Sequence, residues 1–283
     1  MPVEPPIEVP RTLAAAFAIL ASGAHRPIAG GTDVMVQITG EIGSPPDRMI
    51  DLSRLDELRG IAVEGGELRL GALTTYTEIR RSALCREHVP ALVEAAATIG
   101  AAQIQNRGTL GGNVANASPA GDTLPVLLAT DASIVAAGAG GERVIAATEF
   151  WTGYRRTALE AGEIVTAIRI PLAAGREVRF RKVGTRRAQA ISKVVMALGW
   201  HEGERGWSDV RVALGSVAER PIRATDTEAV LEGAAPTPAT AEHAARTLAA
   251  EIEPIDDVRS TAEYRRVVAA RVLHRLIRDA GGW

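Results

Sequence analysis

Two short segments combine glycines with polar side chains in a way that suits the binding of a phosphorylated cofactor. The first runs from Ala29 to Val34 as Ala-Gly-Gly-Thr-Asp-Val. The second runs from Thr109 to Asp122 as Thr-Leu-Gly-Gly-Asn-Val-Ala-Asn-Ala-Ser-Pro-Ala-Gly-Asp. Adjacent glycines permit positive φ and let an anion approach main-chain N–H groups without a Cβ in the way. Two such loops predict a pyrophosphate that is gripped from opposite sides.

An ordinary tight turn is an equally good interpretation of the second segment alone, because Gly-Gly-Asn is common turn chemistry. The repetition of the pattern favours a cofactor site. Neither segment has the G-x-G-x-x-G spacing of a dinucleotide fold, and neither has a glycine followed by Lys and Ser or Thr. The common nucleotide-binding folds are therefore disfavoured.

Composition narrows the function classes. The net charge is −2, so no global positive field indicates nucleic acid or an anionic membrane as a partner. Cys85 is the only cysteine, which excludes an internal disulfide and a thiolate-held iron–sulfur cluster, and which suits a cytoplasmic protein. The five histidines are scattered without metal-binding spacing. We predict no metal ligand and no catalytic acid–base pair or triad in this chain.

The N-terminal sequence carries no expected membrane or export signal. The longest apolar run, Leu13 to Ala21, is too short to span a bilayer. The ten residues before Arg11 contain two glutamates and no lysine or arginine, the wrong charge for a secretion signal.

The glycine segments lie in a mixed α and β pattern. We expect a helix capped by Thr12, a short strand before the first segment, a strand at 49–51, and a helix over 88–99 that leads to the second segment. Hairpins are expected at 61–70 and 134–145, and a long strand at 163–171. Thr75 and Glu78 have capping-box spacing. With 283 residues, two domains are the natural expectation.

A boundary is expected at Ala173-Ala174-Gly175. Three strand-like stretches follow, at 178–183, 194–200 and 210–217, and they suit an antiparallel sheet that is followed by two or three helices. The last helix is expected to begin with a capping box formed by Ser260 and Glu263.

Four segments of the sequence resemble those of a known family. AGGTDVMVQ (29–37) and RGTLGGNVANASPAGDTLPVLLA (107–129) resemble the paired FAD loops of the medium, flavin-binding subunit of molybdenum hydroxylases, the xanthine dehydrogenase and carbon monoxide dehydrogenase family. KVGTRRAQAISKV (182–194) and DDVRSTAEYRR (256–266) resemble further segments of the same subunit. The resemblance therefore extends over nearly the whole chain.

The resemblance implies an α+β fold. A two-lobed FAD-binding domain of the PCMH or vanillyl-alcohol-oxidase type would span residues 1–175, with lobes of about 1–55 and 56–175. A smaller C-terminal α+β domain with an antiparallel sheet would span 176–283.

The resemblance also implies noncovalent FAD, since neither glycine segment contains a histidine or a cysteine for covalent attachment. The pyrophosphate and ribityl chain would lie between the two segments, and Asp122, Ile99, Val165 and Lys182 would lie near the flavin. The cofactor-binding residues so expected are Ala29, Gly30, Gly31, Thr32, Asp33, Val34, Ile99, Thr109, Leu110, Gly111, Gly112, Asn113, Asp122, Val165 and Lys182.

By the same resemblance, partners complete the enzyme. A large subunit would hold the molybdenum cofactor and a small subunit the iron–sulfur clusters, so that this chain passes electrons through FAD to NAD, a quinone or oxygen. Two other functions remain open: a self-sufficient FAD oxidoreductase of related fold, and a structural subunit that has lost its flavin.

A basic cluster has three open interpretations. It consists of Arg179, Arg181, Lys182, Arg186 and Arg187. It is a solvated edge of a hairpin, a site for an anionic acceptor beside the flavin, or a docking site for the acidic surface of a partner.

Overall fold

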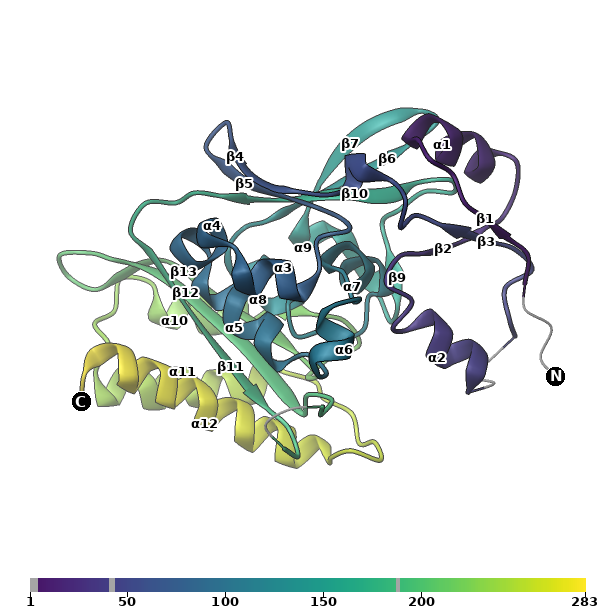
Figure 1. Cartoon of the computed structure of the whole chain (residues 1–283). Coiled ribbons are helices and arrows are strands. Elements are labelled where there is room, and N and C mark those ends of the chain that lie inside the picture. The colour runs from purple at the N-terminus through teal and green to yellow at the C-terminus, as the bar shows by residue number, and fades with distance from the viewer. Residues whose placement is uncertain (1–4, 41–43, 187–188) are drawn as a thin grey trace.

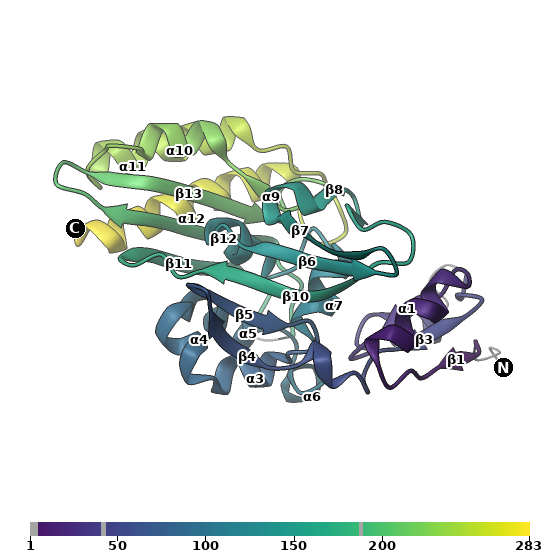
Figure 2. The same ribbon diagram turned by 90° about the horizontal axis from the view of Figure 1, so that it is seen from above.

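The three larger sheets of the protein follow one another along the chain, with helices between and beside them (Figure 1). The computed structural model describes residues 5–40, 44–186 and 189–283. Two views place a small N-terminal lobe at one end of the molecule and the C-terminal helices at the other (Figure 2). The α+β fold expected from the sequence is confirmed, including a C-terminal antiparallel sheet.

The N-terminal lobe is built on a parallel three-stranded sheet in the order β1-β3-β2. Helix α1 begins after Thr12, whose side chain accepts a hydrogen bond from the backbone N–H of Ala15, as the sequence predicts. The lobe has a small core of its own, in which Ala16 and Leu20 pack against Ile50. Helix α2 follows the first glycine segment, and none of its six described residues is buried. The elements are β1 (Ile7–Glu8), α1 (Leu13–Ala21), β2 (Arg26–Ile28), α2 (Val34–Thr39) and β3 (Met49–Asp51).

A five-stranded antiparallel sheet forms the centre of the molecule, in the order β4-β5-β10-β6-β7. Both expected hairpins are present and flank the long strand β10. The strands are β4 (Ile61–Glu64), β5 (Glu67–Gly71), β6 (Ser133–Gly138), β7 (Gly141–Ala146) and β10 (Ile164–Pro171). A short 3-10 turn, Asp56–Leu58, joins this sheet to the lobe, and the small ribbon of β8 (Trp151–Gly153) and β9 (Arg156–Thr157) adjoins it.

Helices α3 to α9 lie between the strands of this sheet in the sequence. The capping box of Thr75 and Glu78 is confirmed, because the Thr75 hydroxyl accepts from the Glu78 N–H while the Glu78 carboxylate accepts from the Thr75 N–H. Pro90 and Pro125 each occupy a first helical turn, where their missing N–H removes no helical bond. The helices are α3 (Tyr76–Arg81), α4 (Ala83–His88), α5 (Pro90–Thr98), α6 (Ala102–Gln105), α7 (Leu110–Asn116), α8 (Leu124–Ala129) and α9 (Ala147–Phe150).

The second glycine segment differs from the expected loop. Gly111 and Gly112 lie in the first turn of α7, where Thr109 is the N-cap and where neither glycine has positive φ. The sequence interpretation was wrong here because glycine is a poor helix former, so that a Gly-Gly pair favours a loop when propensity alone is weighed. Tertiary packing overrides that preference, since Gly111 is buried against Ala72.

A second antiparallel sheet, in the order β11-β12-β13-β14, is covered on both faces. In β12, Val195 and Ala197 face the core that contains α8, whereas Met196 and Leu198 face the core of the C-terminal helices. Burial on both faces explains why this strand reads as a continuous apolar run. The strands are β11 (Arg176–Val183), β12 (Val194–Glu202), β13 (Trp207–Gly215) and β14 (Ile222–Arg223).

Three helices cover the outer face of this sheet: α10 (Thr225–Leu231), α11 (Pro238–Glu251) and α12 (Ala262–Gly281). The expected cap of the last helix is wrong by one residue. Thr261 is the N-cap, and its side chain accepts from the Tyr264 N–H, so Ser260 and Glu263 form no capping box. In the part of the chain that the structure describes, no helix is both long and apolar enough to cross a membrane.

Candidate functional site

A cleft of about 330 Å³ lies between the N-terminal lobe and the body of the molecule. The first glycine segment and α7 lie on it, together with Ala72, Leu73 and Tyr76 before and in α3, and the start of β10. Eleven of the predicted cofactor-binding residues line this cleft, namely Ala29, Gly30, Gly31, Thr32, Asp33, Val34, Thr109, Gly111, Gly112, Asn113 and Val165. The fold therefore brings the two glycine segments together, as expected from the sequence.

The first glycine segment presents a run of unused donors. The backbone N–H groups of residues 30 to 34 have no hydrogen-bond acceptor among the described residues, whereas the next N–H, of Met35, donates to the carbonyl of Gly31 at 3.0 Å. Gly31 has a φ of +74°, a conformation that glycine adopts without steric cost. Successive N–H groups in a turn form an anion-binding concavity. These donors are therefore available to an anionic ligand in the cleft.

Gly30 touches the loop that precedes α7. A Cβ at Gly30 would lie 1.9 Å from the carbonyl oxygen of Arg107, which is backbone and cannot rotate away. The two glycine segments thus approach each other at a distance that only glycine permits.

The N–H groups of the first turn of α7 are all used within the protein. Those of Leu110 and Gly111 donate to the carbonyls of Thr74 and Ala72, both at 2.9 Å. The N–H of Gly112 donates to the Thr109 hydroxyl at 3.1 Å, and that of Asn113 donates to the Thr109 carbonyl at 3.0 Å. The sequence predicts that both segments supply free amides to the ligand. The structure differs, because only the first segment has free N–H groups among the described residues. The second contributes close packing and side chains.

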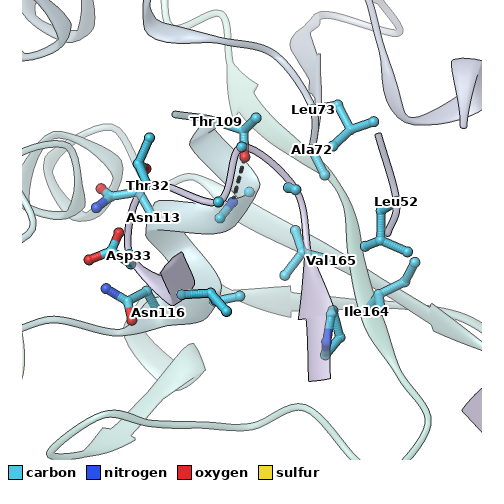
Figure 3. A pocket seen from close by; sticks show the side chains of 18 of the residues that line it. Thr32, Asp33, Leu52, Ala72, Leu73, Thr109, Asn113, Asn116, Ile164 and Val165 are labelled. Carbon is cyan, nitrogen blue, oxygen red and sulfur yellow. Dashed lines mark hydrogen bonds between the residues drawn. The ribbon is translucent and has the colours of Figure 1, made fainter. Parts of the chain in front are cut away.

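The polar and apolar side chains of the cleft lie on separate walls (Figure 3). Thr32, Asp33, Asn113 and Asn116 gather on one side, and Leu52, Leu73 and Ile164 lie on the other. The Asn113 side-chain oxygen accepts a hydrogen bond from the Thr123 hydroxyl at 2.6 Å. This bond orients the amide so that its NH₂ is left for a ligand.

Asp122 and Lys182 form a buried ion pair that does not line the cleft. The Lys182 Nζ lies 2.5 Å from Asp122 Oδ2 and 3.2 Å from the Thr98 carbonyl oxygen. The Ser192 hydroxyl also donates to Asp122. Burial raises the pKa of Asp122 above its ordinary value, although the charge and hydrogen bond of Lys182 act in the opposite direction. Because Asp122 adjoins Thr123, which bonds Asn113, this pair lies beside the polar wall.

The two remaining predicted residues also lie off the cleft. Ile99 follows Thr98 at the end of α5, and its carbonyl accepts from the Gln105 side chain at 2.9 Å. The Leu110 side chain is fully buried in the main core. A leucine at the first position of a capped helix suits cofactor binding and core packing equally well, so the sequence does not distinguish these two roles.

The predicted basic cluster does not stay together. Lys182 is paired with Asp122, and the guanidinium of Arg186 donates to the Gln189 carbonyl. Arg179 and Arg181 face a groove beside α12, and Arg179 stacks over the Trp200 ring at 5.7 Å. Arg187 lies outside the described residues.

Several cleft residues were not anticipated from the sequence. Tyr76 begins α3, and Arg155 lies in the β8–β9 turn, where its guanidinium donates to Asn116 at 2.9 Å. No local motif identifies either one, because each reaches the cleft through the tertiary fold. The capping box before Tyr76 was visible, but a capping box indicates a helix start and nothing about a ligand.

The cleft has the chemistry of a binding site for an elongated anionic cofactor. It offers a run of free N–H donors, amide and hydroxyl side chains, and an apolar wall that suits a planar ring. Among the described residues, no group of three or more His, Cys, Asp and Glu side chains could hold a metal ion.

Comparison with known proteins gives a family for both parts of the chain. A family model described as the FAD binding domain in molybdopterin dehydrogenase matches residues 4–173. A second, described as the CO dehydrogenase flavoprotein C-terminal domain, matches residues 179–280.

Individual relatives agree along nearly the full length. The chain is 33% identical over 244 residues to the glyceraldehyde dehydrogenase medium chain of Sulfolobus acidocaldarius, with 86% of each chain covered. It is 32% identical to the nicotinate dehydrogenase FAD-subunit of Eubacterium barkeri, with 95% of this chain and 94% of that one covered. In the solved structure of carbon monoxide dehydrogenase from Hydrogenophaga pseudoflava, a chain with 31% identity superposes with a TM-score of 0.93, covering 97% of this chain and 96% of that one. This protein is therefore an oxidoreductase subunit that belongs to the molybdenum hydroxylase family, as one of its FAD-binding medium subunits.

Proposed function

We propose that FAD lies noncovalently in the cleft, with its pyrophosphate against the first glycine segment. The observation that carries this proposal is the run of free N–H groups from Gly30 to Val34. The second segment would contribute Thr109 and the free amide of Asn113 to the ribityl and pyrophosphate oxygens, while Gly111 and Gly112 keep the wall of the cleft close to the chain.

The flavin end of the cofactor would extend toward Asp122, Lys182, Ile99 and Val165. Two observations support this direction. Val165 lines the cleft, and the Asn113–Thr123 hydrogen bond links the polar wall to the residue next to Asp122. A buried lysine at this end would place a positive charge near the flavin.

We also propose that residues 1–175 act as the FAD-binding domain, with lobes of about 1–55 and 56–175, and that 176–283 form a C-terminal domain. The change from one sheet to the next between Pro171 and Arg176 supports this boundary. Since Lys182 in β11 and Ser192 just before β12 reach Asp122, both domains would contribute to the flavin environment.

In the complex, the chain would carry electrons away from the site of hydroxylation. Bound FAD accepts electrons one at a time and releases them in pairs, while the protein orients it and sets its electrostatic environment. A single cysteine, Cys85, supports the assignment of the iron–sulfur clusters to a small partner subunit and of the molybdenum cofactor to a large one. NAD, a quinone or oxygen would be the acceptor, and the absence of disulfide-forming cysteine pairs supports a cytoplasmic complex.

The test is to titrate the full chain with FAD and then to precipitate it with acid. We expect one FAD per chain, a yellow soluble fraction and a colourless pellet. A yellow pellet would contradict noncovalent binding, and a chain that takes up no FAD would revive the structural-subunit alternative. If the isolated chain bleaches its flavin on addition of a substrate, without partners, the self-sufficient oxidoreductase is correct instead.

A further inference from the structure

Tyr76 lies at the first position of α3, in the wall of the cleft. The capping box of Thr75 and Glu78 fixes the first turn of this helix, and the Tyr76 N–H donates to the Gly108 carbonyl at 3.3 Å. The ring packs against Gly108, where an added Cβ would lie 2.8 Å from Tyr76 Cε2. The tyrosine ring is therefore held in one place before any ligand binds.

The hydroxyl of this ring has no hydrogen-bond partner among the described residues. Tyr76 is 4% exposed, yet its oxygen makes no hydrogen bond with any residue in the described part of the chain. In the described part of the chain, the fully enclosed side-chain N and O atoms without a partner are Trp207 Nε1 and Arg265 Nε. The Tyr76 oxygen is not among them, so it still reaches open space. Buried tyrosine hydroxyls normally find a hydrogen-bond partner.

The surroundings of the hydroxyl make it a donor. Burial raises the pKa of Tyr76 far above its ordinary value, and the negative charges of Asp33 and Asp122 raise it further. The group therefore stays protonated across the physiological range. Tyr76 lines the same cleft as Asp33 of the first glycine segment.

We propose that the Tyr76 hydroxyl donates a hydrogen bond to an oxygen of the ribityl–pyrophosphate chain of bound FAD. This inference rests on the proposed function. The cofactor would supply the acceptor that the described residues lack, in the cleft that Tyr76 shares with the donors of Gly30 to Val34. Tyr76 is thus a further binding residue that positions the middle of the cofactor.

Tyr76→Phe tests the proposal, because phenylalanine keeps the ring packing against Gly108 and removes only the hydroxyl. In the full chain we expect the dissociation constant for FAD to rise about tenfold, as for the loss of one hydrogen bond to a polar or charged acceptor. The melting temperature of the FAD-free chain should stay the same or rise, since the removed hydroxyl has no partner there. The visible absorption maxima of bound flavin should stay unchanged, because the contact is to the chain and not to the ring.

Tyr264→Phe is the matched control. Tyr264 is half-exposed on α12 and its ring faces Lys193, a contact that phenylalanine retains. This control should bind FAD as the wild type does. An unchanged FAD affinity in Tyr76→Phe would overturn the inference, and so would weaker binding accompanied by a lower melting temperature of the FAD-free chain, which would indicate a structural role. Failure of the proposed function gives a different result, because the wild-type chain itself would then take up no FAD.

Discussion

At the scale of single residues, the shape of the cleft depends on two glycines, which have no Cβ. Gly30 allows the first glycine segment to touch the Arg107 carbonyl, and Gly31 adopts positive φ. Together they shape a stretch of the cleft wall whose N–H groups have no acceptor among the described residues. The glycines of α7 contribute close packing instead, since their N–H groups already donate hydrogen bonds within the protein.

Gly30→Ala should weaken FAD binding by about tenfold or more. The new methyl group would overlap the Arg107 carbonyl oxygen and force the two segments apart, which is an overpacking cost of about 1–3 kcal/mol. Titration of the full chain with FAD measures the effect.

Gly140→Ala is the control for that experiment. Gly140 lies in the β6–β7 turn without positive φ, and a Cβ there would meet no atom within 4 Å. Equal loss of affinity in both variants would show that the contact with Arg107 is not the reason.

Lys182→Met should lower the free energy of unfolding of the FAD-free chain by about 3 kcal/mol, because it leaves the buried carboxylate of Asp122 without its ionic partner. Burial without that partner raises the pKa of Asp122 in the folded state above its unfolded value. A raised acid pKa means that the folded state binds the proton more tightly, so the deficit should be larger at neutral pH than at mildly acidic pH.

Denaturant unfolding at the two pH values measures this deficit. Lys193→Met removes the cation–π contact with Tyr264 and should cost less than about 1 kcal/mol at either pH. A deficit for Lys182→Met that does not change with pH would mean that Asp122 carries no charge in the folded protein.

Sequence reasoning found most of the cleft because its key residues are contiguous. Ala29 to Val34 lie side by side in the chain, so their turn chemistry is visible locally. Whether each N–H group is already hydrogen-bonded cannot be seen from the local sequence, since the acceptors of Leu110 and Gly111 lie in residues 72–74. Tyr76 escaped notice for the same reason.

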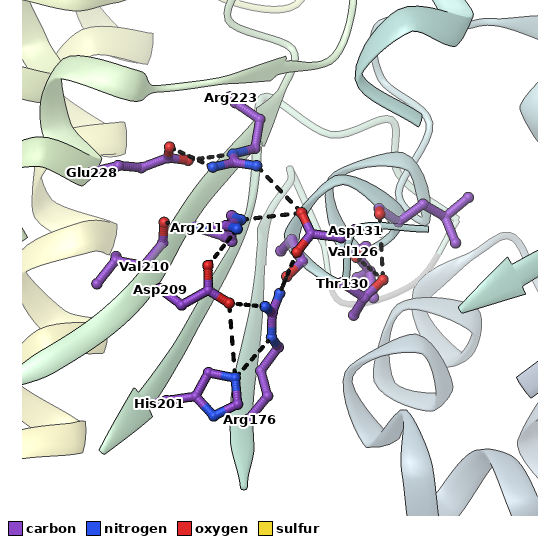
Figure 4. Close-up of polar contacts among 12 residues, drawn as sticks. Val126, Thr130, Asp131, Arg176, His201, Asp209, Val210, Arg211, Arg223 and Glu228 are labelled. Carbon is purple, nitrogen blue, oxygen red and sulfur yellow. Dashed lines mark hydrogen bonds and ion pairs between the residues drawn. The ribbon is translucent and has the colours of Figure 1, made fainter. Parts of the chain in front are cut away.

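At the scale of elements, the junction between α8 and the second sheet depends on a network of ion pairs (Figure 4). Asp131, just after α8, has a φ of +51° and accepts from Arg176 at 2.9 Å and from Arg211 at 3.1 Å. Arg176 also pairs with Asp209, and Arg211 does the same. The hairpins and the capping box of Thr75 and Glu78 follow from local sequence patterns. A network among separate elements does not, because no spacing rule relates Asp131 to Arg176.

Asp131→Asn should lower the melting temperature at neutral pH. Burial tends to raise the pKa of Asp131, but the guanidiniums of Arg211 and Arg176 outweigh it and hold that pKa below its ordinary value. A lowered acid pKa contributes stability above the unfolded value that is lost as the pH falls through the folded one. The difference between wild type and variant should therefore shrink below about pH 4.

Asparagine tolerates the left-handed conformation of Asp131, so this substitution isolates the charge. Asp47→Asn, at an exposed loop position, provides the control and should melt as the wild type does at each pH. A difference for Asp131→Asn that persists in acid would assign the effect to geometry and not to charge.

At the scale of the whole molecule, the chain is a flavoprotein with one cysteine, and that cysteine is buried. Burial raises the pKa of the Cys85 thiol above its ordinary value, which makes it a weak ligand and a weak nucleophile. The fold class and the family were predictable from the sequence because the motifs extend over both domains. Under the proposed function, electron transfer to and from the flavin depends on groups of the partner subunits.

Expression with and without the partner subunits should separate the cofactors by chain. The isolated chain should bind FAD with no iron and no molybdenum, and the co-purified complex should contain all three. Elemental analysis together with the visible spectrum measures this. Stoichiometric iron in the isolated chain would contradict the assignment of the clusters to a partner.

The small size of the N-terminal lobe has a consequence for the local opening of the protein and for its change when FAD binds. Its strands contain two or three residues each, and its core is small, so this lobe should open locally at a lower free energy than the central sheets. FAD that contacts both the lobe and the body would bind only the closed form and would raise that opening free energy by mass action. Amide hydrogen exchange at Leu52, which donates to Ile28 across β3 and β2, should therefore slow on FAD addition, whereas exchange within β12 should not change. The lobe would then be a dynamic gate through which the cofactor enters and which the cofactor itself closes.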